Sequence, residues 1–201
     1  MIRVLLAEDQ TMVRGALASL LNLEPDIEVV AQVSRGDDVA AAAAASVPDI
    51  ALLDIEMPGR TGLDAADELV RALPGCRILM LTTFGRPGYL RRAMEGGAAG
   101  FLLKDAPASE LASAIRRAVA GERVVDPGLA AAALSQGDSP LTPREHEVLR
   151  ASRQHATVAD LAQALYLSPG TVRNHLSSAM QKLDARNRAE AVRIAEENGW
   201  L

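Results

Sequence analysis

The segment ALLDIEMPGRTGL, residues 51–63, decides which fold the chain is expected to have. It contains the end of an apolar run, residues 50–53, whose length and composition suit a fully buried strand. The run ends on a carboxylate, Asp54, and the chain then breaks at Pro58 and Gly59. Aspartate is common where a strand meets water, so Asp54 is either an ordinary exit residue or a reactive group. The rest of the sequence has to separate these two interpretations.

Short apolar runs alternate with amphipathic stretches through the first 120 residues. The runs occupy residues 3–7, 28–33, 50–53, 77–81 and 100–103, and helical patterns occupy residues 10–23, 36–46, 62–72, 88–95 and 107–120. Five repeats of a strand followed by a helix predict an α/β fold, a five-stranded, doubly wound parallel sheet with helices on both faces.

The remaining residues have the pattern of a linker and a small helical domain. Residues 121–139 have no sustained period and contain Pro127, Gly128 and Gly137, although a short helix could form over residues 129–134. Beyond them the pattern is entirely helical, with four predicted N-caps: Thr142, Thr157, Ser168 and Asn187. We therefore expect domains at residues 1–120 and 140–201, the second a small all-α helix-turn-helix unit, joined by a linker at 121–139.

Composition and charge restrict the class of protein. Of the 201 residues, 49% are apolar and 2% aromatic, so the core must be aliphatic. The single cysteine, Cys76, cannot form an internal disulfide, and no apolar run suits a signal peptide or a membrane span, so we expect a cytoplasmic protein. Residues 1–138 carry a net charge of −6 (13 basic, 19 acidic) and residues 139–201 one of +1 (eight basic, seven acidic), which suggests different partners for the two parts.

Three carboxylates are expected to meet at one edge of the sheet. Glu8 and Asp9 directly follow the first strand, and Asp54 ends the third. In the strand order 2-1-3-4-5, common in doubly wound sheets, these strands are neighbours, and ligands bind beyond their carboxyl ends. Like charges this close repel unless a cation neutralises them, and Mg²⁺ commonly binds one or two carboxylates with waters and a phosphate.

Two further strand ends supply groups that a phosphate would need. Thr82 follows the fourth strand with a hydroxyl, and Lys104 follows the fifth with an ammonium. Lys104 is one of only two lysines beside 19 arginines, which indicates a position that the larger guanidinium does not fit. Each residue alone is also compatible with a solvated loop. Together they favour a nucleophilic aspartate, Asp54, that accepts a phosphoryl group.

Four segments resemble the signature segments of response-regulator receiver domains: LLAEDQ (5–10), LLDIEMPGRTGL (52–63), LMLTTF (79–84) and GFLLKD (100–105). The resemblance covers residues 1–120 and implies a flavodoxin-like receiver. It implies that Asp54 is the phosphoacceptor, that Thr82 is the switch hydroxyl and that Lys104 binds the phosphate. It also implies an aromatic switch at Phe101 and a Mg²⁺ site formed by Glu8, Asp9, Asp54 and the backbone carbonyl of Glu56.

The segment SPGTVRNHLSSAMQKL, residues 168–183, has the pattern of a recognition helix. An apolar face recurs at helical spacing, formed by Val172, Leu176, Ala179 and Leu183. Arg173, Asn174 and Ser177 lie on the opposite face. A polar face is typical of any solvated helix, but arginine pairs with guanine and asparagine with adenine in the major groove.

Residues 141–198 resemble the C-terminal module of the LuxR/NarL/FixJ regulators through LTPREHEVL, LAQALYLSPGTVRNHLSSAMQKL and RNRAEAV. The resemblance implies that six side chains contact DNA. Those facing bases are Arg173, Asn174 and, more weakly, Ser177, and those facing phosphates are Thr171, His175 and Lys182. His155 stands where this family usually has a glycine, so we expect a positive φ there.

The two resemblances together predict a phosphorylation-dependent transcriptional regulator and not an enzyme. A sensor histidine kinase would phosphorylate Asp54, receivers would pair as a homodimer, and two modules would bind double-stranded DNA. Regulators of this class often pair through their first and fifth helices, here residues 10–23 and 107–120. We favour that face over one formed by residues 88–95, 100–103 and 107–120.

Two details refine this expectation. The segments DIEMPGRTGL and LTTFGRPGYLRRA resemble DesR-type regulators, which implies a lipid-responsive membrane kinase and membrane-lipid target genes. An aspartate-based phosphohydrolase is the alternative, in which Glu56 would be the second acid two residues after the nucleophile. Sustained turnover of a phosphate ester would favour the enzyme, whereas a single stoichiometric phosphorylation favours the regulator.

Overall fold

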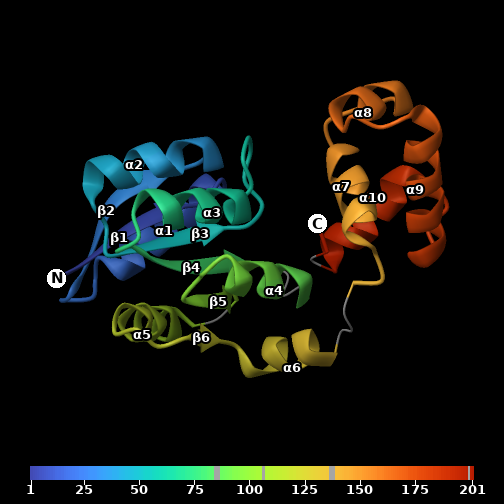
Figure 1. The fold of residues 1–201 in the computed structure, drawn as a ribbon. Helices are drawn as coiled ribbons and strands as arrows, with labels where there is room; N and C mark the ends of the chain where they lie inside the picture. Colours follow the sequence, from blue (N-terminus) through green and yellow to red (C-terminus); the bar gives the residue numbers. More distant parts are fainter. Residues whose placement is uncertain (84–86, 106, 136–138, 199) are drawn as a thin grey trace. The chain divides into compact units, whose positions relative to one another are not determined.

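The computed structural model describes residues 1–83, 87–105, 107–135, 139–198 and 200–201 (Figure 1). The chain forms two compact units, one comprising Met1–Gly85 and Leu90–Ala131 and the other Arg86–Tyr89 and Ala132–Leu201. Within the described residues, no helix combines the length and the apolar character needed to cross a lipid bilayer.

A parallel sheet forms the centre of the first unit, with its strands in the order β2-β1-β3-β4-β5-β6. The strands are β1 (Ile2–Ala7), β2 (Ile27–Val33), β3 (Ile50–Asp54), β4 (Arg77–Thr82), β5 (Gly100–Leu103) and β6 (Val124–Val125). The predicted α/β class and the order of the first five strands are confirmed. Strand β3 is buried along its whole length, as expected for a central strand of a sheet with both faces covered.

The sixth strand was not predicted, so the expectation of five strands was wrong. β6 pairs with β5, with Val124 beside Gly100 and Val125 beside Phe101. This close approach depends on Gly100, because a Cβ there would lie 2.4 Å from the carbonyl oxygen of Val124. A strand of two residues is too short to show a hydrophobic period. The sheet therefore extends into the segment expected to be a linker.

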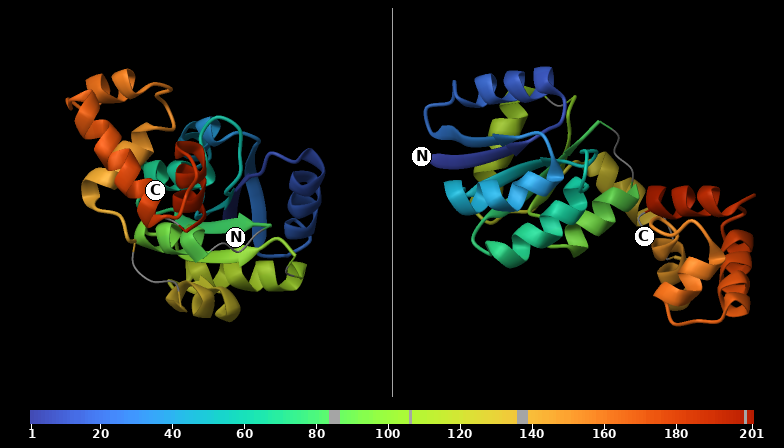
Figure 2. Two further views of the ribbon diagram at one scale, coloured as in Figure 1. Left: turned by 90° about the vertical axis from the view of Figure 1, so that its right-hand side faces the viewer. Right: turned by 90° about the horizontal axis from the view of Figure 1, so that it is seen from above.

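Helices cover both faces of the sheet. They are α1 (Thr11–Leu21), α2 (Val39–Ser46), α3 (Gly62–Ala72), α4 (Pro87–Glu95) and α5 (Ala108–Val119), and a 3₁₀ turn, η1 (Gly36–Asp38), precedes α2. α1 and α5 lie side by side on one face, and α2, α3 and α4 lie on the other (Figures 1 and 2). A further helix, α6 (Pro127–Ser135), follows β6 where a shorter helix was expected.

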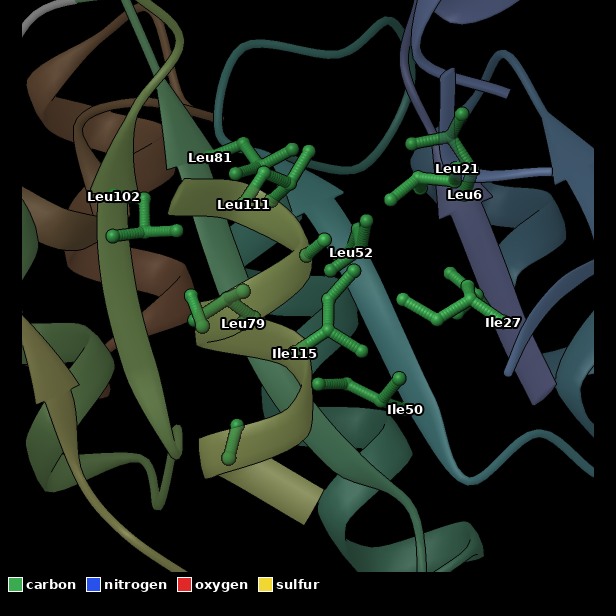
Figure 3. Packing of buried hydrophobic residues seen from close by; sticks show 14 of the residues in the cluster. Leu6, Leu21, Ile27, Ile50, Leu52, Leu79, Leu81, Leu102, Leu111 and Ile115 are labelled. Atoms are coloured by element: carbon green, nitrogen blue, oxygen red, sulfur yellow. The ribbon is translucent and has the colours of Figure 1, made fainter. Parts of the chain in front are cut away.

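The core between the sheet and the α1–α5 layer is aliphatic. Leu111 and Ile115 of α5 point toward the strands, where they lie near Leu52 of β3 and Leu79 of β4 (Figure 3). Burying one such side chain stabilises the fold by about 1.5–3 kcal/mol. This packing fixes the strands against the helices, and with them the positions of the residues at the strand ends.

The second unit contains the helices α7 (Pro143–Ala151), α8 (Val158–Ala164), α9 (Pro169–Lys182) and α10 (Arg188–Glu197). All four predicted N-caps are confirmed. The side chains of Thr142, Thr157, Ser168 and Asn187 each accept a hydrogen bond from the backbone N–H three residues further on. The predicted apolar face of α9 is also confirmed, because Val172, Leu176, Ala179 and Leu183 are buried in one cluster.

The backbone at His155 differs from the expectation. Its φ is not positive, and among the described residues of this unit the non-glycine residues with positive φ are Tyr166 (54°) and Asp184 (50°). The His155 N–H donates to the carbonyl of Ala151, 3.1 Å away, so the chain continues the last turn of α7. Arg188 donates to the His155 carbonyl at 3.3 Å, which satisfies that group without a left-handed residue.

Candidate functional site

The structure brings three carboxylates together beyond the ends of β1 and β3. The two strands are paired in register up to Ala7 and Leu53, so Glu8, Asp9 and Asp54 follow at the same edge. Their nearest carboxylate oxygens lie within 4.8 Å of one another. Glu8 and Asp54 are buried, whereas Asp9 is partly exposed. Oxygen ligands at this density suit a hard divalent cation.

Lys104, just past β5, neutralises part of this negative charge. Its Nζ lies 2.6 Å from Glu8 Oε2 and 2.9 Å from Asp54 Oδ2, and only 10% of its side chain is exposed. Burial disfavours the ammonium, but its interactions with Glu8 and Asp54 outweigh that effect and raise the pKa of Lys104. Burial also raises the pKa of Asp54, although Lys104 opposes the shift. The ammonium is therefore charged and in contact with the carboxylate of Asp54.

A glycine allows the chain to turn back against the end of β3. The Gly62 N–H donates to the carbonyl of Ile55 at 2.9 Å, and a Cβ on Gly62 would lie 1.8 Å from the carbonyl oxygen of Asp54. The loop that contains Glu56 is thereby closed against the end of β3. The Glu56 side chain itself is exposed, so that its backbone, rather than its carboxylate, is the part held beside Asp54.

Thr82 and Phe101 occupy the positions that their strands dictate. Thr82 is buried at the end of β4, one residue beyond the partner of Asp54 in the neighbouring strand. The backbone N–H of Lys104 donates to the Thr82 carbonyl at 2.8 Å, so the two strand ends are joined. Phe101 lies in β5 and is fully buried. The ring that the resemblance implies to be a switch therefore lies inside the protein in this structure.

Exposed polar groups line one side of α9, opposite its buried apolar face. Arg173, Asn174 and Ser177 are exposed, and Thr171 and His175 are partly exposed. The Thr171 hydroxyl lies 2.8 Å from that of Ser168, the N-cap of the helix. The predicted base-facing residues therefore share one accessible surface, whereas Thr171 is partly committed to capping.

Lys182 has a partner that sequence reasoning missed. Its Nζ lies 2.7 Å from Oε2 of Glu145, a carboxylate buried at the start of α7, and Ser178 donates to Oε1 at 2.6 Å. Burial alone would raise the pKa of Glu145, but the hydrogen bonds from Lys182, Ser178 and Thr142 lower it to about 2. The capping-box spacing from Thr142 to Glu145 was a visible signal for part of this network. No signal in the sequence indicated the contact between Glu145 and Lys182, because the two residues lie far apart along the chain.

Comparisons with known proteins match each unit to a family. The family described as response regulator receiver domain matches residues 4–116, and the family described as bacterial regulatory proteins, luxR family, matches residues 139–195. The chain is 48% identical over 203 residues to the uncharacterized transcriptional regulatory protein YvfU of Bacillus subtilis (strain 168). It is 47% identical over 201 residues to the transcriptional regulatory protein DesR of the same strain. Both matches cover 100% of each protein.

A solved structure agrees with this assignment. The response regulator ChrA of a heme-sensing two component system matches 100% of this chain and 98% of its own, with 35% identity and a TM-score of 0.59. YvfU and DesR are named as transcriptional regulators, and the helical unit matches a family of regulatory proteins. These findings do not favour the phosphohydrolase alternative.

Proposed function

Because the chain belongs to the response regulators that join a receiver domain to a LuxR-type DNA-binding domain, we propose that phosphorylation of Asp54 controls its binding to DNA. The observation that carries this proposal is the buried group at the strand ends. Asp54 lies there beside two further carboxylates and 2.9 Å from an ammonium. A nucleophile, the ligands for a cation and a counter-charge for phosphate are thus gathered at one place.

In the proposed transfer, a carboxylate oxygen of Asp54 attacks the phosphorus of a phosphohistidine on a sensor histidine kinase. A P–O bond forms as the P–N bond breaks, and the electron pair of the broken bond returns to the imidazole nitrogen. Lys104 supports the step, because an ammonium beside Asp54 stabilises the added negative charge on the phosphoryl oxygens. Burial raises the pKa of Asp54, and the contact with Lys104 opposes that rise and so favours the ionised nucleophile.

The donor set of the pocket fits Mg²⁺. Glu8, Asp9 and Asp54 would hold the ion together with the backbone carbonyl of Glu56. When bound, Mg²⁺ would neutralise charge on the transferred group. Lys104 shares that task, and its two close contacts keep the carboxylates of Glu8 and Asp54 from repelling each other.

Phosphorylation adds about −1.5 to −2 charges to this pocket. We expect the Thr82 hydroxyl and the Lys104 ammonium to turn toward the new oxygens. Phe101 is already buried, so phosphorylation would stabilise this arrangement against others rather than create it. A shift of the active fraction from 1% to 99% requires about 5.5 kcal/mol of differential stabilisation.

An apolar surface on α1, next to α5, supports pairing of receivers on that face. Three large apolar side chains are exposed on or just after α1: Met12, Leu20 and Leu23. A pocket of about 130 Å³ lies between the two helices, lined by Val13, Leu17, Leu20, Leu81, Leu102, Leu103, Lys104 and Leu111. Lys104 thus belongs both to this pocket and to the acidic site, so that a movement of its side chain would reshape the surface proposed to form the homodimer.

The exposed face of α9 is the proposed reader of double-stranded DNA. Arg173 and Asn174 would contact bases in the major groove, with Ser177 as a weaker contact, and Thr171 and His175 would lie toward phosphates. The Lys182 ammonium is bound to Glu145, and 33% of the side chain is exposed. Lys182 would therefore contact a phosphate only through N–H groups that Glu145 does not occupy. A single module has few cations, so paired half-sites and a dimer are needed for useful specificity.

Two further expectations belong to this proposal. Action on DNA would place the protein in the cytoplasm, and the resemblance to DesR-type regulators makes a membrane-lipid gene the first target to examine. The experiment that tests the function compares the wild-type chain with Asp54→Asn, each with Mg²⁺ and with or without acetyl phosphate.

Sedimentation reports the oligomeric state in this experiment, and selection from random duplex DNA reports binding. We expect the donor to dimerise the wild-type chain and to tighten its binding to selected DNA by about 5- to 150-fold, the usual range of such coupling. Asp54→Asn should respond in neither assay. An equal response of both proteins would exclude switching through Asp54.

A further inference from the structure

Tyr166 is an exposed aromatic residue in the turn between α8 and α9. The residue is 96% exposed, more than any other large hydrophobic residue among those described. Its neighbours Leu165 and Leu167 pack against the core of the second unit, and Tyr166 does not belong to that cluster. The side chain therefore contributes no packing to the fold.

The backbone at Tyr166 is left-handed, with a φ of 54°. Residues with a Cβ avoid this region because the side chain crowds the backbone, whereas glycine and asparagine occupy it readily. Tyrosine at this position thus costs stability in the backbone and recovers none through burial. An unfavourable backbone conformation of this kind indicates a functional role, such as contact with a binding partner.

The surroundings of Tyr166 fit a polyanion. No acidic residue occurs between Asp160 and Asp184, a stretch that includes the turn and the whole of α9. The exposed residues Arg173 and Asn174 lie on α9, and this helix begins three residues after Tyr166. Tyrosine hydroxyls are among the groups that contact phosphate oxygens in complexes with DNA.

We propose that the Tyr166 hydroxyl donates a hydrogen bond to a phosphate oxygen of the DNA backbone, an inference that rests on the proposed DNA-binding function. The contact fixes how α9 sits on the duplex and carries no sequence information. A phenol is neutral and releases no counterion, so the contact adds affinity without changing the salt dependence of binding.

The test uses the full chain with Mg²⁺ and acetyl phosphate, and fluorescently labelled duplex DNA of random sequence as the probe, because a phosphate contact does not depend on sequence. Tyr166→Phe removes only the hydroxyl, and Tyr166→Gly removes the side chain and relieves the left-handed backbone. Val47→Gly is the matched control, since Val47 has a φ of 44° and lies in the first unit. Arg173→Ala, measured on duplex DNA selected by the wild-type chain, reports whether α9 reads DNA at all.

We expect Tyr166→Phe and Tyr166→Gly each to weaken binding about tenfold, the value for one hydrogen bond to a charged group, with an unchanged slope of log affinity against log salt. The melting temperature of Tyr166→Gly, followed by Trp200 fluorescence, should equal or exceed that of the wild type. Val47→Gly should bind DNA as the wild type does.

Wild-type affinity in Tyr166→Phe overturns the proposal, and so does a lower melting temperature in Tyr166→Gly, which would make Tyr166 a packing residue. If Arg173→Ala weakens binding while the Tyr166 variants do not, this inference alone fails. If the wild-type chain does not bind the duplex, the proposed function fails and this inference fails with it.

Discussion

Replacing Lys182 by methionine should destabilise the second unit far more than the loss of an exposed lysine would. The Lys182 ammonium lies 2.7 Å from Glu145, whose side chain is 4% exposed. Ser178 and the backbone N–H of Thr142 also donate to this carboxylate, at 2.6 and 2.7 Å. In Lys182→Met the buried carboxylate keeps its neutral donors and loses its counter-charge.

The pKa of Glu145 gives the size of the effect. Lowering it from the ordinary 4.5 to about 2 corresponds to about 3 kcal/mol of stability at neutral pH. Lys182 is the only cation among the donors, so we assign it about 2 kcal/mol, against at most about 1 kcal/mol for an exposed ion pair. Because the folded-state pKa lies below the unfolded one, this stabilisation is complete above pH 4.5 and is lost as the pH falls toward 2.

Trp200 makes the measurement specific to this unit within the full chain. It is the single tryptophan of the sequence and packs against the helical core. Urea unfolding followed by its fluorescence should show a loss of about 2 kcal/mol in Lys182→Met at pH 7, and the difference should shrink below pH 4.5.

Gln181→Met, an exposed neighbour on α9, is the matched control and should change the stability by less than about 0.5 kcal/mol. Adding Glu145→Gln to Lys182→Met should restore part of the loss, because no unpaired buried charge remains. If Lys182→Met and Gln181→Met have the same free energy of unfolding, the ion pair does not stabilise the unit and the reasoning fails.

Three other predictions test the site and its surroundings. Gly62→Ala should lower the free energy of unfolding of the first unit by about 3 kcal/mol in far-UV circular dichroism melts, because the new Cβ would lie 1.8 Å from the Asp54 carbonyl oxygen. Gly15→Ala, with open space around it, is the control and should stabilise the same unit by about 0.5–1 kcal/mol. Equal melting curves for the two variants would contradict this prediction. Lys104→Met should fold but fail to dimerise with Mg²⁺ and acetyl phosphate in sedimentation, and a normal response would remove Lys104 from the proposed mechanism. Arg173→Ala should weaken binding to DNA selected by the wild type by about 1–3 kcal/mol and relax the preference at one base position. A uniform loss of affinity across sequences would instead indicate a phosphate contact.

The strand ends were predictable because hydrophobic pattern and topology act together there. The apolar run before Asp54 marks a buried central strand, and the parallel order then brings Glu8 to the same edge. Lys104 stood out through the near absence of lysine from the chain. The ion pairs that join these residues follow from that convergence, but their distances and burial required the structure.

Other features depend on contacts that no local pattern carries. β6 has only two residues, and its pairing with β5 is possible because Gly100 has no side chain. The partner of Lys182 lies on another helix, so a residue predicted to face phosphates has its ammonium bound to Glu145. At His155, a hydrogen bond from the Arg188 guanidinium to the backbone carbonyl and one from the backbone N–H to Ala151 replace the left-handed turn that a glycine would have allowed.

The most direct test of the account is the mass of the intact protein after incubation with Mg²⁺ and acetyl phosphate. We expect the wild-type chain to gain one phosphoryl group, located on Asp54 by peptide mapping after borohydride reduction, and Asp54→Asn to gain none. A wild-type chain that stays unmodified, or one that is modified at another residue, would contradict the claim that the buried carboxylate at the end of β3 is the phosphoacceptor.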